Sequence, residues 1–364
     1  MRRRAMVSLL FVLGTATVGL SCGKSAPPTV DVTGTWLGTA TSDVDGSSLQ
    51  VVLGMKQEDA AVSAQLGLQS LTSWNANTSN DFTGTVEGAE VTLDIASDQG
   101  DPWTFTATVS GESATGTYSI TLYREDAAYT DQGTWSVKRV PASPLTSTLL
   151  FSVDADIGAM TFDGTHLWLD GSGLDPNGAN LCKFTLQGDR VACFDTPNPP
   201  YDGVPAVCSG AMTFDGTNLR CHNRNYDGRL YVIDTNGAFV SQVNTTHADG
   251  ALAWDGETLW CAQDVADLES LDAAGNALST IQISLPHPSG LAWDGESLWL
   301  ADEPVVRIYR LDRTGKVLGV SDPPPMTSAQ RLTALAWDGA RLLVSIAEWT
   351  NGTARSQIYA LEAK

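Results

Sequence analysis

The stretch SGLAWDGESLWL at residues 289–300 decides the fold, because related stretches recur four more times along the chain. In each copy an aromatic residue precedes an Asp-Gly pair, and a leucine follows the glycine by three positions. The pairs, which are 52, 40, 39 and 44 residues apart, begin at Asp163, Asp215, Asp255, Asp294 and Asp338. A repeat of about 40 residues is the length of one four-stranded propeller blade. The sequence therefore predicts an all-β chain with a β-propeller over residues 143–364.

One copy of the repeat shows how a blade is built. Residues 289–293 read as the inner strand, and the Asp-Gly pair that follows predicts a tight turn because both residue types tolerate a positive φ. Residues 298–301, 307–312 and 317–320 then read as the second, third and outer strands. Aromatic and leucine positions that recur in every copy predict packing between blades. The Asp-Gly pairs are accordingly interpreted as turns, not as calcium ligands.

The two ends of the repeat region indicate how the ring closes. The fifth copy ends at Lys364 directly after its third strand, so it lacks an outer strand. Residues 148–153 have the pattern of an outer strand but no inner strand of their own. We expect this segment to complete the last blade, since that pairing removes two open sheet edges. The prediction is a five-bladed propeller whose last blade is closed by an N-terminal strand.

These copies resemble the NHL and streptogramin-lyase-like superfamily of repeat propellers, over about residues 143–364. The resemblance implies the fold and no particular activity. Five blades with Asp-Gly and Leu-Trp elements are also similar to the plant-type glutaminyl cyclases. The catalytic signature of that family is not found in this sequence, so the catalytic residues, if there are any, stay unknown.

Residues 31–140 precede the repeats and contain runs of Thr, Val and aromatic residues that alternate with period two. About eight such runs predict a small antiparallel β-barrel or sandwich. The triplet Gly34-Thr35-Trp36 resembles the opening of lipocalin-type barrels, and a second Gly-Thr-Trp triplet ends at Trp135. We expect the first and last strands to pair and both tryptophans to fill the barrel. The alternative is a ligand cavity between them.

The N-terminus has the pattern of an export signal. Three arginines are followed by a short apolar segment at residues 5–20, which is too short for a stable membrane span. A small residue before Cys22 at the end of this segment resembles a bacterial lipobox. The resemblance implies a signal peptide over residues 1–22, a lipid on Cys22 and a tether at residues 23–30. The alternative is ordinary secretory cleavage near Ser21.

The net charge and the export signal limit the cellular compartment and the partners that we expect for this protein. A formal net charge of −21 repels phosphate backbones, so no nucleic-acid partner is expected. The export signal predicts the cell envelope, either as an outer-membrane lipoprotein or as a periplasmic or secreted protein. The expected partners are the membrane, through the lipid anchor, and an unknown protein or small ligand. No cofactor and no metal site are predicted.

Cysteine spacing predicts disulfides in the first two blades. Beyond Cys22, the sequence contains Cys182, Cys193, Cys208, Cys221 and Cys261. A two-residue turn at Gln187-Gly188 places Cys182 opposite Cys193, which favours a cross-strand disulfide. Cys208 pairs with Cys221 in one interpretation, and a bridge between Cys221 and Cys261 of adjacent blades is the alternative. One thiol stays unpaired because the number is odd.

Polar side chains gather in the loops that join outer to inner strands and second to third strands. These loops are expected to surround one mouth of the central channel, where propeller ligands bind. The candidate ligand face comprises Asp170, His222, Arg224, His247, Asp264, His287, Asp302, Glu303 and Trp349. The preferred hypothesis is a lipid-anchored binding or scaffold protein. The alternative is a propeller enzyme of cyclotransferase or lyase type, with acid–base chemistry at the channel mouth.

Overall fold

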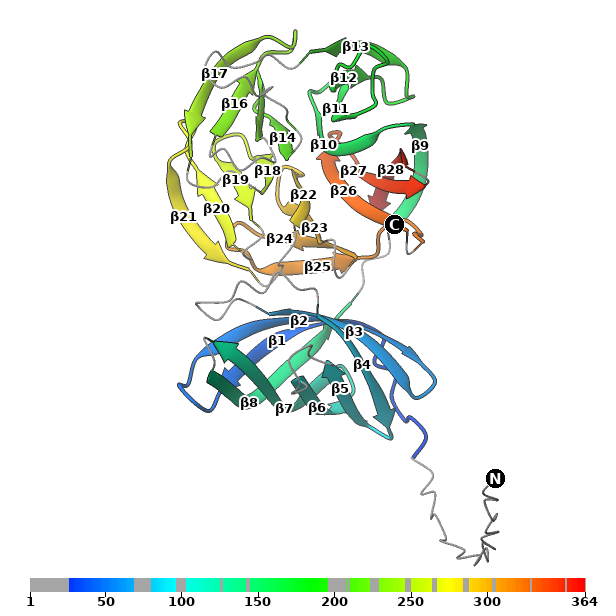
Figure 1. Cartoon of the computed structure of the whole chain (residues 1–364), viewed down its shortest axis with the longest axis vertical. Coiled ribbons are helices and arrows are strands. Elements are labelled where there is room, and N and C mark those ends of the chain that lie inside the picture. Colours follow the sequence, from blue (N-terminus) through cyan, green and yellow to red (C-terminus); the bar gives the residue numbers. More distant parts are fainter. Residues whose placement is uncertain are drawn as a thin grey trace, which may run out of the picture.

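The computed structural model contains a closed barrel and a ring of five four-stranded sheets, and the regular elements that it describes are all strands (Figure 1). The residues that the structure describes are 26–68, 80–95, 103–124, 127–141, 145–195, 208, 210–222, 229–245, 250–263, 267–283, 288–302, 306–327, 329–350 and 352–363. They include no helix that is long and apolar enough to cross a membrane. The predicted signal peptide and Cys22 lie outside the described residues.

The barrel consists of eight antiparallel strands in which each strand pairs with the next and β1 pairs with β8. The strands are β1 Gly34–Ser42, β2 Ser48–Glu58, β3 Ala61–Leu68, β4 Asn80–Glu87, β5 Glu90–Ile95, β6 Trp103–Ser110, β7 Ser113–Arg124 and β8 Ala127–Val140. In the closing pair, Ala40 lies opposite Trp135. The predicted small barrel and its closure between first and last strands are confirmed.

Aromatic side chains fill the middle of the barrel. Trp36 is fully buried, and its indole donates to the carbonyl oxygen of Val32 at 2.9 Å. Trp135 is 3% exposed and donates to the carbonyl oxygen of Thr106 at 3.0 Å. The Phe105 ring packs edge-on against Trp135 with 5.9 Å between ring centroids. Both indoles therefore serve the core, as the packing interpretation predicted.

The propeller contains five antiparallel blades, and each runs outward from an inner strand at the channel. Its strands are β9 Leu145–Val153, β10 Asp156–Phe162, β11 Leu167–Ser172, β12 Leu181–Phe184, β13 Arg190–Phe194, β14 Ala211–Phe214, β15 Leu219–His222, β16 Arg229–Ile233, β17 Phe239–Asn244, β18 Ala251–Trp254, β19 Leu259–Ala262, β20 Asp267–Leu271, β21 Ala277–Gln282, β22 Pro288–Trp293, β23 Leu298–Asp302, β24 Arg307–Leu311, β25 Val317–Ser321, β26 Gln330–Trp337, β27 Leu342–Thr350 and β28 Thr353–Ala363.

Strand β9 is the outer strand of the last blade, although it precedes the first blade in the chain. It runs antiparallel to β28, with Phe151 opposite Ile358 (Figure 1). The Phe151 ring also stacks on Phe184 of the first blade at 5.9 Å. The last blade is therefore joined to both ends of the repeat region, and the predicted closure of the ring is confirmed.

Neighbouring blades also pack against each other at the turn between the third and outer strands. Gly237 in this turn of the second blade has a φ of 78°, and a Cβ built on it would lie 2.3 Å from the Phe194 ring of the first blade. The corresponding Gly188 of the first blade lies against Phe151, where a Cβ would be 2.6 Å away. Glycine is required here because any side chain would push neighbouring blades apart.

The barrel rests against the outer edge of the propeller (Figure 1). Leu37, Val52 and Val140, on its outer surface, belong to a hydrophobic cluster that also contains Ile281 of β21 and Val317 of β25. Val52 is only 3% exposed, although it alternates with residues that face the barrel interior. This contact joins the two domains through apolar surface.

Candidate functional site

The Asp-Gly pairs at one rim of the propeller form hydrogen-bonded clamps. Asp255 accepts bonds at Oδ1 from the backbone N–H groups of Glu257 (3.0 Å) and Thr258 (2.7 Å). Its Oδ2 accepts from the Trp260 indole at 3.0 Å and lies 3.0 Å from the Arg313 guanidinium of the next blade. Asp163, Asp215, Asp294 and Asp338 make the same pair of backbone contacts. Protein donors thus occupy these carboxylates, in agreement with their interpretation as turns.

Three of the predicted site residues lie at the opposite rim, which we call the loop face, and each belongs to a different blade. Asp170 pairs with the inner strand at Ala159, and His222 pairs with it at Ala211. Asp302 sits at the end of β23, the second strand of the fourth blade. All three side chains are fully buried between blades, so the register brings them to one end of the ring but not into solvent.

The remaining predicted residues divide into two groups. Trp349 is described, and it is 43% exposed near the end of β27. The others lie outside the described residues: Arg224, His247, Asp264, His287 and Glu303.

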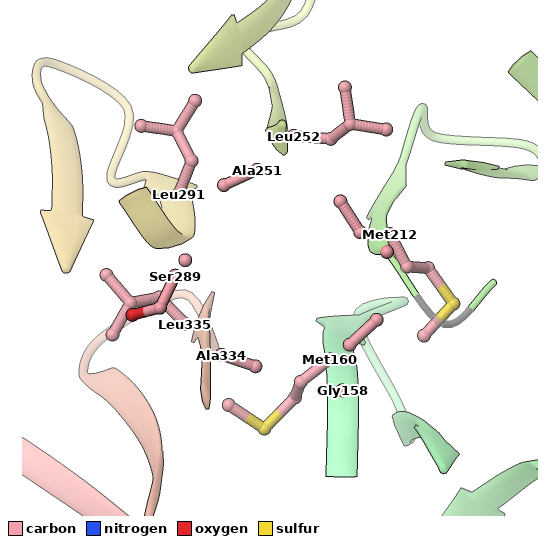
Figure 2. A pocket seen from close by; sticks show the side chains of 13 residues that line it. Gly158, Met160, Met212, Ala251, Leu252, Ser289, Leu291, Ala334 and Leu335 are labelled. Atoms are coloured by element: carbon pink, nitrogen blue, oxygen red, sulfur yellow. The ribbon is translucent and has the colours of Figure 1, made fainter. Parts of the chain in front are cut away.

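The central channel between the inner strands is narrow and leaves room for about one water molecule (Figure 2). Its walls are glycine, alanine and larger apolar side chains such as Met160, Met212 and Leu291, and the one polar side chain in this lining is Ser289. Asp170 and His222 lie one strand behind this wall. The described lining carries no ionisable group, and the channel is far too narrow for a typical small-ligand pocket.

A polar cluster, which we call the His222 cluster, lies buried between the second and third blades. The His222 Nε2 atom is 3.8 Å from the Sγ atom of Cys261. Cys261 lies directly opposite Glu269 on the neighbouring strand. Glu269 in turn accepts hydrogen bonds from Gln263 at 2.9 Å and Thr280 at 3.3 Å. Within the part of the chain that the structure describes, no three His, Cys, Asp or Glu side chains are placed to hold a metal ion.

Sequence reasoning singled out His222 but missed Glu269. The structure aligns Glu269 with Tyr231 and Tyr309, because each lies opposite the third residue of its blade's second strand. The sequence did contain a signal for Glu269: it is a glutamate at the repeat position where the second and fourth blades carry a buried tyrosine. Tyr309 itself is fully buried, and this burial, together with the nearby charge of Asp302, raises the pKa of its phenol.

The structure contains two disulfides, Cys182–Cys193 and Cys208–Cys221. Cys182 and Cys193 are direct cross-strand partners with 4.1 Å between their Cα atoms, which is the short separation of a non-hydrogen-bonded pair. Cys261 is buried and belongs to neither of these disulfides. The bridge between Cys221 and Cys261 is therefore not the one formed.

The last blade extends further along the loop face than its neighbours. Strands β27 and β28 stay paired as far as Thr350 opposite Thr353, which makes a long hairpin. Trp349 lies near its tip, and the Arg331 guanidinium sits 6.0 Å from the Trp349 ring centroid. Among the described residues, the other large hydrophobic side chains that are exposed are aliphatic: Val44, Leu149, Val191, Val240, Leu278 and Leu318. We call this hairpin the Trp349 ridge.

The fold defines a two-domain β protein: a five-bladed propeller with an eight-stranded barrel at its edge. No protein-family model and no curated protein matches the chain. Among solved structures, glutaminyl cyclase from Myxococcus xanthus is 13% identical, with a TM-score of 0.47 over 62% of this chain and 100% of that one. Apo AztD from Citrobacter koseri is 10% identical, with a TM-score of 0.30 over 80% of this chain and 96% of that one. At these identities no activity is transferred.

Proposed function

We propose that this chain is an exported, lipid-anchored binding protein whose propeller presents its loop face to a protein or small ligand. The observation that carries the proposal is the Trp349 ridge, where an exposed indole stands on a fully paired hairpin beside Arg331. Tryptophan and arginine are among the residue types enriched at the hot spots of protein interfaces. A rigid hairpin holds them in place, so little ordering is needed on binding.

The burial of the three other candidates that the structure describes also favours binding over catalysis. A general acid or base must reach the proton that it transfers. Asp170, His222 and Asp302 are fully buried between blades and do not line the channel. Trp349 is the candidate side chain that a partner can contact directly among those that the structure describes.

The lipid anchor is tested by metabolic labelling with an alkyne-tagged fatty acid. We expect the wild-type protein to take up the label and the Cys22→Ala variant to lose it completely, because the thioether at Cys22 is the attachment point. Ser21→Ala keeps a small residue before the cysteine and should label like the wild type. Equal labelling of wild type and Cys22→Ala would contradict the anchor.

The binding surface is tested with Trp349→Ala. We expect this variant to bind the partner at least about 30-fold more weakly, since truncating an interface hot spot costs about 2 kcal/mol or more. The measurement is capture from a solubilised envelope extract, followed by titration of the captured component. Leu278→Ala, which removes a 62% exposed side chain from β21, is the matched control and should bind normally. A partner held equally well by Trp349→Ala would rule out the ridge.

A further inference from the structure

A short segment that precedes β1 is packed onto the barrel. We call this segment, residues 26–33, the N-terminal strap. The Thr29 N–H donates to the Gly88 carbonyl oxygen at 2.8 Å, and the Gly88 N–H donates in return to the Ala26 carbonyl oxygen at 3.3 Å. The strap is therefore hydrogen-bonded to the turn between β4 and β5 from its first residue onward.

The second half of the strap is held by β1, β2 and β8. The Val32 N–H donates to Oε1 of Gln57 at 2.9 Å, and the Val32 carbonyl oxygen accepts from the Trp36 indole at 2.9 Å. The Arg139 guanidinium donates to the Asp31 carbonyl oxygen. The Val32 side chain is fully buried in the barrel core. The strap is thus part of the folded barrel, because these contacts must break before it can leave.

The strap crosses one end of the barrel, which we call the strap end. It joins β1 at Gly34 and reaches the β4–β5 turn at Gly88, which lies across the closed ring of strands from β1. Because neighbouring strands run in opposite directions, the turns after β2, β4 and β6 lie at the strap end. The turn after β1 lies at the other end of the barrel.

The docked strap leaves a short connection between the barrel and the cysteine that we expect to carry the lipid. Four Cα–Cα steps lead from Cys22 to Ala26, and they span at most about 14 Å. If the strap were free, the connection would run from Cys22 to Gly34 and could span about 43 Å. The strap therefore keeps the strap end close to Cys22.

We propose that the strap end of the barrel is a membrane-facing surface, which the lipid on Cys22 holds against the phospholipid headgroups. The proposal rests on the lipid anchor of the proposed function and adds an orientation to it. The barrel packs on the propeller edge through an apolar cluster that includes Val52 of β2 and Ile281 of β21. Fixing the strap end therefore also fixes how the loop face is presented to a partner.

The charge of the strap end means that the lipid, and not the protein surface, supplies the attraction to the membrane. Lys56 and Arg139 at this end pair with Glu58 and Glu112. The exposed acidic side chains in and beside the turns of this end are Glu58, Asp59, Glu87, Glu90 and Glu112. An acidic surface is not attracted to anionic lipids. We therefore expect the chain without its lipid to leave the bilayer.

The test compares bimane labels at the two ends of the barrel in the acylated full chain. Glu87→Cys lies beside Gly88 at the strap end, and Val44→Cys lies in the turn after β1, where the side chain is 52% exposed. The buried Cys261 and the two disulfides leave the introduced thiol as the reactive one. The vesicles contain phosphatidylethanolamine, phosphatidylglycerol and a lipid with a nitroxide headgroup, which quenches bimane at close approach.

We expect the nitroxide to remove most of the fluorescence of the Glu87→Cys label and little of that of the Val44→Cys label. The two ends lie about 20 Å apart along the tilted strands, so only one of them can be close to the headgroups. Insertion of about twelve Gly/Ser residues between Ser25 and Ala26 keeps the strap in place but lets the barrel move about 20 Å from the anchor. This insertion should abolish most of the quenching at Glu87→Cys.

The outcomes separate this proposal from the lipid anchor itself. If the wild type does not float with the vesicles, or if Cys22→Ala floats equally well, both the anchor and the membrane-facing end are refuted. If the wild type floats and the two labels are quenched equally, the membrane-facing end alone is refuted. Unchanged quenching after the Gly/Ser insertion would likewise show that the short connection does not hold the strap end at the membrane.

Discussion

Phe151→Asp is expected to lower the free energy of unfolding of the propeller by about 3 kcal/mol or more, because it places an unpaired carboxylate in a packed junction between blades. Phe151 stacks on Phe184 and contacts Gly188, so it connects the strand that closes the ring to the first blade. Loss of this contact loosens the packing of the last blade on the first. Detachment of β9 from β28 then uncovers the sheet edges that closure had removed.

The matched control is Leu149→Asp, two residues earlier on the same strand, where the side chain is 46% exposed. We expect it to cost less than about 1 kcal/mol. Thermal melts followed by near-ultraviolet circular dichroism, together with limited proteolysis, compare the two. Equal melting of Phe151→Asp and Leu149→Asp would show that β9 does not hold the ring closed.

The fold could be predicted because the residues that determine it recur at a regular spacing along the chain. Asp-Gly pairs about 40 residues apart mark the turns of successive blades. The closing strand was visible at residues 148–153 because an outer strand stood there without an inner one. The register of Cys182 with Cys193 followed from the short turn between them in the same way. Each of these inferences uses neighbours along the chain or a repeat.

The depth of the candidate site residues could not be predicted in this way. Asp170, His222 and Asp302 read as loop-face residues, and they do lie at that rim, but the pairing places them behind the inner strands and between blades. Alternation gives the face of a sheet on which a side chain lies, not what covers that face. Asp131 of the barrel is the sharpest case, because an aspartate that stands between Thr130 and Gln132 reads as solvent-exposed and is in fact buried.

The stability of the propeller is expected to fall steeply as the pH drops below about 4, because its aspartate clamps must then take up protons. Burial alone would raise the pKa of Asp255, but hydrogen bonds from Trp260, Thr258 and Glu257 and the charge of Arg313 lower it below its usual value. The pKa values of Asp163 and Asp215 are lowered by equivalent hydrogen bonds that outweigh burial. For a depressed pKa, the stabilisation is fully present above the unfolded value and is lost as the pH falls through the folded one.

Asp255→Ala isolates one clamp in this pH response. At pH 7 we expect it to cost about 2–4 kcal/mol, since it leaves two backbone N–H groups, the Trp260 indole and Arg313 without their acceptor. Glu296→Ala, at an 85% exposed side chain in the equivalent turn of the next blade, should cost less than about 0.5 kcal/mol. Urea unfolding between pH 2 and pH 7 then compares the slopes. The variant has one fewer carboxylate with a lowered pKa, so its free energy of unfolding should fall less steeply below pH 4. Parallel curves for variant and wild type would exclude Asp255 as a source of the acid sensitivity.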